Sequence, residues 1–351
     1  MSTALSGWLV LPDRLVTGTI TLEGSRIARI QRRRIKRPQR YIAPGLIDLH
    51  LWGEPRRLAR LETRGGTTAF LSALGPLPPE RLTQRLAAWG ALPATHGARW
   101  LGTHLEGPWV NRRQAGALNV AAIRPPLVRE CRRLWQASRG QIRIVTLAPE
   151  LLGARRATAF WRRHGVTVSC GHTSASYEEA RRGIAAGMRC ATHLWNKMGS
   201  PHQRRPGIIG ALLEDARVMV MLLVDGKHLH PTTVTLIYRL IGAERLVLVT
   251  DSTRTVPLAD DPSLGLRRAQ FTGRLAGTRL TMMRAVRNLV AFTGIPVSAA
   301  VRAATLNPAR LLGLDRRRGR LAVGCDADLV VFDERFRVLQ TFVNGQVVYE
   351  R

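Results

Sequence analysis

Lysine is nearly absent from this chain of 351 residues, which contains only Lys36, Lys197 and Lys227. Arginine supplies the other 51 of the 54 basic residues, and with 24 acidic residues the formal net charge is +30. Such a charge ordinarily indicates binding to nucleic acid or to an anionic membrane. The arginines are dispersed over nearly every predicted helix, so we interpret the charge mainly as compositional bias and expect neither partner.

One basic cluster stands apart from this dispersion, the segment QRRRIKRPQR at Gln31–Arg40. It could touch an acidic partner, although a solvated loop beside a small domain is the interpretation we favour. A generally positive field would in any case help to attract a phosphorylated substrate.

Cysteine is also scarce, and the four residues lie far apart without any Cys-x-x-Cys spacing. They are Cys131, Cys170, Cys190 and Cys325. Two of them fall inside predicted buried strands, so we expect reduced, small hydrophobic side chains in a cytoplasmic protein. No apolar run approaches eighteen residues, and the N-terminal segment has neither the basic flank nor the cleavage site of a signal peptide. We therefore expect no membrane segment.

What the chain does contain is a large apolar fraction, 45% of its residues, which can bury a sizeable core. Both ends alternate apolar and polar residues, and Asn344-Gly345 is typical of a hairpin turn. Between the ends, eight short apolar segments alternate with helical patterns: LIDLHLW, TTAFLSAL, ARWLGTHLEG, IRIVTLAP, VTVSCGH, RCATHLW, VMVMLLVDG and RLVLVTD. This order predicts an α/β fold, a (β/α)8 TIM-like barrel over 45–316, with a small β-sandwich domain built from both chain termini, 1–44 and 317–351.

The chain is organised around two predicted strands, Val166–Cys170 and Met188–Thr192, with a helix opening at Ser176 between them. His172 and His193 follow these strands and should leave the barrel at the same edge, where chemistry is assembled. A lone histidine after a strand is most often an ordinary loop residue. Two at equivalent strand ends make a metal site as plausible as that alternative, provided that a third ligand is present.

Polar residues of the kind that bind metal or move protons end several other predicted strands. They are Asp48 with His50, His104 with Glu106, Asp225 with His228, and Asp251. A carboxylate with two imidazoles leaves an open coordination position, which is the arrangement of a catalytic zinc. Each residue alone is a weak signal, but the set at strand ends is a strong one.

The motifs carried by these segments resemble those of the N-acetylglucosamine-6-phosphate deacetylases, a family within the amidohydrolase superfamily, over essentially the whole chain. PGLIDLH, TLNPARLLGL and GRLAVGCDADLVVFD are shared widely across the superfamily and say little about substrate. HLEGP, GHTSA, THLWNKM followed by RRPG, and DGKH are much more specific to the deacetylases.

The resemblance implies that Glu106, His172 and His193 hold one divalent metal ion, with zinc expected. Asp251 then corresponds to the carboxylate that takes a proton from the attacking water and returns it to the departing amine. Arg204 and His228 correspond to contacts of the substrate phosphate, and the family's arginine reaches across a homodimer interface. The full set of implied substrate-binding residues is Asn196, Lys197, Arg204, His228, Ala117, Leu275, Ala276 and Gly277.

The sequence departs from the family pattern in three places. Metal-rich superfamily members carry His-x-His on the first strand, but here the pair is His50 and Trp52, and an indole is no ligand. We therefore predict one metal, with His50 as either a spectator or a weak ligand. Leu118 stands where the family often has a polar residue that polarises the acetyl carbonyl. Lys197 replaces a usual alanine, and the segment after the first strand is short.

These features predict hydrolysis of the acetamide of N-acetylglucosamine 6-phosphate to glucosamine 6-phosphate and acetate. Because of the departures, two alternatives stay open. One is a deacetylase of a related amino-sugar phosphate, such as N-acetylgalactosamine 6-phosphate, or of a pathway-specific amino sugar. The other is a catalytically impaired homologue with a binding role.

Overall fold

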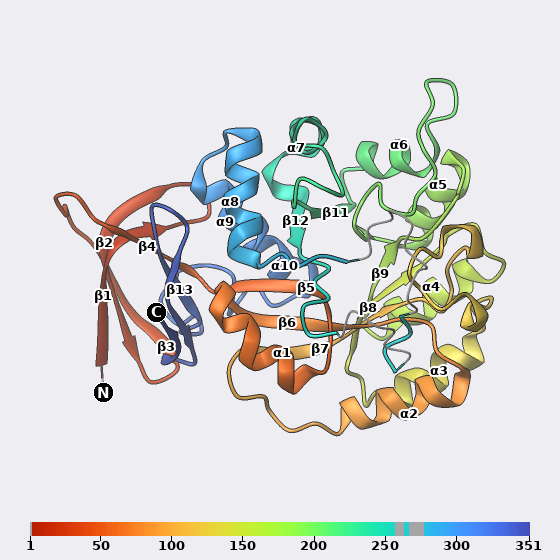
Figure 1. The fold of residues 1–351 in the computed structure, drawn as a ribbon, viewed down its shortest axis with the longest axis horizontal. Helices are drawn as coiled ribbons and strands as arrows, with labels where there is room; N and C mark the ends of the chain where they lie inside the picture. Colours follow the sequence, from red (N-terminus) through yellow and green to blue (C-terminus); the bar gives the residue numbers. More distant parts are fainter. Residues whose placement is uncertain (1, 257–262, 267–276) are drawn as a thin grey trace.

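The barrel forms the larger part of the molecule in the computed structural model, which describes residues 2–256, 263–266 and 277–351 (Figure 1). Its eight parallel strands neighbour one another in chain order. They are β5 (Leu46–Trp52), β6 (Thr67–Leu74), β7 (Arg99–Glu106), β8 (Ile142–Leu147), β9 (Thr167–Cys170), β10 (Cys190–Ala191), β11 (Met219–Leu223) and β12 (Leu246–Val249). The first and last strands meet just beyond β12, where the Asp251 amide donates to the His50 carbonyl at 3.0 Å. The predicted (β/α)8 fold is confirmed.

Helices alternate with these strands and pack around them (Figure 1). They are α1 (Pro55–Glu62), α2 (Pro79–Gly90), α3 (Val128–Ala137), α4 (Ala154–Arg163), α5 (Tyr177–Ala186), α6 (Gly207–Glu214), α7 (Pro231–Arg245), α8 (Met282–Thr293), α9 (Val297–Ala303) and α10 (Leu306–Leu311). Every residue of β5 and β6 is buried, because barrel strands face the interior on one side and helices on the other. This explains their continuous apolar sequences.

The predicted strand–helix–strand unit is present, with one strand shorter than expected. Ser176 caps α5, because its hydroxyl oxygen accepts from the Glu179 amide and the Glu179 carboxylate accepts from the Ser176 amide. In place of Met188–Thr192, β10 contains only Cys190 and Ala191. The Thr192 amide still donates to the Cys170 carbonyl at 2.8 Å, so the contact with β9 continues although the backbone leaves the regular extended form.

A separate sheet of seven strands is built from both chain termini, which lie side by side in Figure 1. Its order is β15 (Gln346–Glu350), β14 (Val338–Val343), β13 (Leu329–Asp333), β4 (Arg40–Pro44), β1 (Ser2–Val10), β2 (Leu15–Glu23) and β3 (Arg26–Arg32). Asn344 and Gly345 both have positive φ, 54° and 74°, as a type I′ hairpin requires. The chain passes into the barrel at Gly45, and the domain limits 1–44, 45–316 and 317–351 remain our prediction.

The remaining composition-based expectations concern the surface and the thiols. All four cysteines are buried and unpaired. Most of Gln31–Arg40 is exposed, and its part beyond β3 forms the loop that leads to β4. None of the described helices is long and apolar enough to cross a membrane.

Candidate metal centre and active site

Glu106 lies between two imidazoles at the ends of three barrel strands. Its Oε1 is 3.1 Å from His172 Nε2 and 2.9 Å from His193 Nε2. All three residues are at most 4% exposed. Glu106 ends β7, whereas the histidines follow β9 and β10, so the parallel barrel brings together residues that are up to 87 positions apart in sequence. The structure therefore places the three predicted ligands in one cluster.

The donor chemistry of this cluster fits a divalent cation. His172 Nδ1 lies 2.7 Å from the Gln114 carbonyl, so Nδ1 carries a proton and donates. In neutral His172 the lone pair of Nε2 then faces a carboxylate oxygen, an arrangement that a cation between the two would stabilise. Burial favours the neutral form of Glu106, but the neighbouring imidazoles His50 and His172 outweigh it and hold its pKa well below the ordinary value.

The backbone is strained where these side chains leave their strands. His172, His193 and Asp251 have φ values of 49°, 31° and 48°, in the left-handed region that L-residues rarely adopt. Each follows the end of a barrel strand within two residues. Such conformations persist when the surrounding structure imposes them, and they gather at functional sites. Here they turn three side chains toward one point above the barrel.

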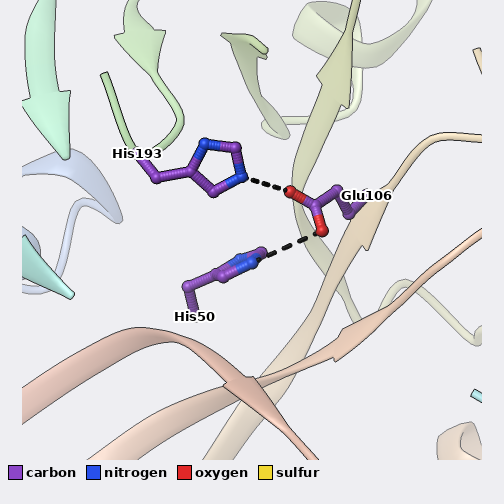
Figure 2. Close-up of side chains that lie close together, drawn as sticks. All are labelled: His50, Glu106 and His193. Carbon is purple, nitrogen blue, oxygen red and sulfur yellow. Dashed lines mark hydrogen bonds and ion pairs between the residues drawn. The ribbon is translucent and has the colours of Figure 1, made fainter. Parts of the chain in front are cut away.

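His50 joins the same cluster from β5. Its Nε2 is 3.5 Å from Glu106 Oε2 and 3.3 Å from Asp251 Oδ1, and Figure 2 shows His50 and His193 each facing one oxygen of the Glu106 carboxylate. His50, Glu106 and His193 form a group compact enough to hold a metal ion. Burial alone would lower the pKa of His50, but the carboxylates of Glu106 and Asp251 raise it to about 10.

A buried histidine, His104, contacts the ring nitrogen of His50 that points away from Glu106 and Asp251. His104 Nδ1 lies 2.9 Å from His50 Nδ1 and 2.8 Å from the Leu49 carbonyl, while its Nε2 lies 2.7 Å from Thr146 Oγ1. Burial, followed by the charge of His50, lowers the pKa of His104 to about 3, so His104 is neutral.

Asp251, the predicted proton carrier, follows β12 on the other side of His50. Trp52 Nε1 donates to its Oδ1 at 2.8 Å. The Asp251 side chain is 13% exposed, more than that of Glu106, so it borders the opening of the site. The predicted carboxylate therefore stands beside the predicted ligands without being enclosed among them.

The residues predicted to bind the phosphate are more exposed than the cluster around Glu106 and do not all contact one another. His228 Nδ1 lies 2.7 Å from Asp225 Oδ2, and this bond, against the effect of burial, lowers the pKa of Asp225 to about 2. Asn196 donates to the His193 carbonyl at 3.2 Å. Lys197 packs closely along Gly116, where an added Cβ would lie 2.7 Å from its Cε. Arg204 is exposed.

Of the remaining predicted residues, Ala117 is half-buried beside Leu118, and Gly277 lies against Asp251, whose carbonyl would be 2.9 Å from an added Cβ. Leu275 and Ala276 fall outside the described residues. Leu118 is buried in the main apolar core and pairs by its backbone with Leu266. It provides no side-chain donor to a carbonyl.

Two residues that shape the site, Glu150 and Trp52, were not predicted to do so from the sequence. Glu150 accepts from Asn111 Nδ2, Thr173 Oγ1 and the Ser174 amide at 2.9, 2.6 and 2.9 Å, so it fixes the loop that carries His172. In the sequence it only follows the predicted strand segment IRIVTLAP. Trp52 appeared in the sequence only as a lost ligand, and nothing local indicated its bond to Asp251.

A barrel whose strand ends gather a carboxylate and imidazoles defines a class of metal-dependent hydrolases. The model of the Amidohydrolase family matches residues 41–348, so the chain belongs to this family. Among curated relatives, N-acetylglucosamine-6-phosphate deacetylase of Vibrio furnissii is 31% identical over 88% of this chain and 83% of its own. N-acetylgalactosamine-6-phosphate deacetylase of Escherichia coli O157:H7 is 32% identical over 89% of each chain.

Solved structures agree with this placement. N-acetyl-D-glucosamine-6-phosphate deacetylase of Mycobacterium smegmatis, a mutant in complex with N-acetyl-D-glucosamine-6-phosphate, matches with a TM-score of 0.90 and 31% identity over 99% of both chains. The Thermotoga maritima deacetylase matches with a TM-score of 0.86 and 27% identity, over 99% of this chain and all of its own. The resemblance expected from the motifs is confirmed.

Proposed function

We propose that the chain hydrolyses the acetamide of N-acetylglucosamine 6-phosphate, giving glucosamine 6-phosphate and acetate. The observation that carries this proposal is the convergence of Glu106, His172 and His193, with Asp251 beside them, in a chain about 30% identical to such deacetylases. Amide hydrolysis needs activation of the carbonyl and of water, and a proton for the leaving nitrogen.

Glu106, His172 and His193 would hold one divalent metal ion, and we propose zinc because two imidazoles and one carboxylate are a common donor set of catalytic zinc. When bound, such an ion polarises the acetyl carbonyl and lowers the pKa of water. The Gln114 carbonyl fixes the tautomer of His172, so that its Nε2 stays available for the ion.

Asp251 would carry the proton. Its carboxylate takes a proton from the attacking water as the new C–O bond forms at the acetyl carbon. It then gives that proton to the nitrogen as the C–N bond breaks, so the amine leaves as a neutral group together with acetic acid. The acid then loses the second proton of the water, which gives acetate and protonates the amine. The partial exposure of Asp251 supports this role, because the group has to reach the substrate.

The phosphate would bind over the loop from Asn196 to Arg204, together with Lys197 and His228. A guanidinium and an imidazole provide charge-assisted bonds to phosphate oxygens. The exposure of Arg204 leaves its guanidinium free for a ligand or a partner subunit, which supports a homodimer in which this arginine completes the neighbouring site. We place the protein in the cytoplasm, where unpaired cysteines are ordinary.

A second substrate has its own support. The relative from Escherichia coli O157:H7, a deacetylase of N-acetylgalactosamine 6-phosphate, is as similar to this chain as the glucosamine enzymes are. The two sugars differ only in the configuration of one hydroxyl, and Lys197 and the short segment after β5 lie in the regions that would contact the sugar. We therefore keep this epimer as the alternative substrate.

Release of acetate from each sugar phosphate, followed by mass spectrometry, tests the proposal. We expect turnover of N-acetylglucosamine 6-phosphate, loss of turnover on chelation, and recovery with one equivalent of zinc. Asp251→Asn should keep the metal and lose turnover by about 10²- to 10⁴-fold. Turnover that persists after complete removal of metal would contradict the mechanism. Intact metal binding without hydrolysis of any acetylated sugar phosphate would favour the impaired homologue.

A further inference from the structure

Trp52 stands at the position from which a second metal ligand would enter the site. It follows His50 by two residues on β5, so both side chains point to the same face of the strand. Its ring meets the His50 ring edge-on, with centroids 5.9 Å apart, and its Nε1 donates to Asp251 Oδ1 at 2.8 Å. At 2% exposure, the indole is enclosed while its one polar atom faces the active-site carboxylate.

His50 Nε2 lies 3.3 Å from the same oxygen, at ion-pair distance, and makes no hydrogen bond among the described residues. Trp52 Nε1 is therefore the side-chain hydrogen-bond donor to Asp251 Oδ1 in the described part of the chain.

We propose that Trp52 is a positioning residue for the proton-carrying carboxylate. Its Nε1 holds Oδ1 of Asp251 by an N–H bond, in place of the second metal that the His-x-His pattern would bind. Among the described residues no side chain donates to Oδ2, so this oxygen remains available to the attacking water and the leaving amine. The inference rests on the proposed function, and it explains how one metal suffices beside an indole.

Trp89 offers a matched control far from the chemistry. It is also 2% exposed, and its Nε1 donates to the Glu54 carboxylate at 3.0 Å. Trp89 lies on α2, and Glu54 precedes α1, so this indole–carboxylate pair has the same chemistry without any contact to Glu106, His172 or His193. Any general cost of removing a buried indole N–H should appear equally at both positions.

The first experiment compares Trp52→Phe, Trp52→Gln and Trp89→Phe in the full-length, zinc-loaded protein. Phenylalanine keeps an aromatic ring and removes the N–H. Glutamine loses the ring but keeps an N–H at the same number of bonds from Cα. We measure kcat, KM, metal per chain and Tm for each variant.

We expect Trp52→Phe to lower kcat about 10- to 100-fold, the effect of a lost bond to a charged group, with KM and the single metal retained. Trp52→Gln should recover part of kcat despite a lower Tm, and Trp89→Phe should leave kcat unchanged. A structural role for Trp52 gives the opposite order, with phenylalanine better than glutamine, and overturns the proposal. Two metal ions per wild-type chain also overturn it.

A second measurement does not depend on turnover. The indole N–H resonance of Trp52, assigned by its loss in Trp52→Phe, should shift and exchange faster in Asp251→Ala, while the Trp89 resonance stays in place. An unchanged Trp52 resonance overturns the proposal whatever the substrate is. If that resonance responds but the wild-type protein releases no acetate, the proposed function fails and the indole–carboxylate contact stands.

Discussion

The metal centre and the loop expected to bind phosphate are built in opposite ways. The centre uses side chains at most 4% exposed, each fixed by strand ends and by bonds to buried neighbours. The loop that contains Arg204 and Arg205 lies outside the strands, with both arginines exposed and a local bond between the His202 and Arg205 backbones. On the proposed function, the strand ends would carry the chemistry, and the loop would determine which substrate stays bound.

This division makes different demands on the two regions. Ligands must converge within a few tenths of an ångström, which rigid strands provide and loops seldom do. A phosphate can be met by long, flexible arginines whose charge acts over several ångströms. Substitutions in the centre should therefore affect metal and kcat, and substitutions in the loop should affect KM.

The largest effect is expected from His193→Ala. Loss of one of three ligands should remove the bound metal and reduce turnover at least about 10³-fold, because the remaining pair cannot retain the ion. Metal analysis after gel filtration and acetate release measure the two effects. His164→Ala is the control, since its exposed ring contacts Phe160 on α4 and Trp135 on α3 and none of the predicted ligands. Full metal content in His193→Ala would show that His193 is not a ligand and that the buried cluster does not bind the metal as proposed.

Arg204→Ala should act on the substrate instead. We expect KM for the 6-phosphate sugar to rise about 10- to 100-fold through loss of a charge-assisted bond, with kcat nearly unchanged. The unphosphorylated acetamido sugar should be hydrolysed equally by both proteins. Arg163→Ala, at the exposed end of α4, controls for net charge. An equal change for both sugars would show that Arg204 does not contact the phosphate.

Glu150→Gln probes the connection between a loop and the centre. The three bonds that Glu150 accepts hold the segment that carries His172. Removing its charge should weaken zinc affinity about 10-fold, as for other groups that orient ligands, while the protein stays folded. Competition with a chromophoric chelator measures the affinity. An unaltered affinity would mean that the strand end alone fixes His172.

The smallest effect is expected from Ser176→Ala at the start of α5. Loss of the capping bond to Glu179 should reduce the free energy of unfolding by about 1 kcal/mol. The capping bonds join Ser176 and Glu179 and involve none of the predicted ligands, so kcat and KM should not change. Urea unfolding together with acetate release tests both statements, and a fall in kcat would show that this helix contributes to the site.

The sequence predicted what depends on periodicity and chain order. The eight strands, the cap at Ser176 and the gathering of polar residues at the strand ends follow from short apolar runs that end in polar residues. The choice of Glu106, His172 and His193 among those residues was implied by the family resemblance, and the structure brings the three together. The short β10 was missed because hydrophobicity does not show where an extended backbone turns into the left-handed region at His193.

The role of Trp52 could not be found in this way. Its partner Asp251 is 199 residues away, and only closure of the barrel brings the two together. The presence of Trp52 in the His-x-His pattern shows that a metal ligand is missing. It does not show that the indole donates to Asp251. For the same reason the sequence left His50 open between spectator and ligand, since its contact with His104, on another strand, forms only in the folded barrel.

The seven-stranded terminal sheet has a consequence for the order of events during translation. Strand β4 pairs with β1 on one side and with β13 on the other, and β13 begins at Leu329, after the whole barrel in chain order. The ribosome thus makes β1 to β4 early and β13 only after the barrel. Until β13 has been made, the edge of β4 that it covers remains open, a template for pairing with other nascent chains.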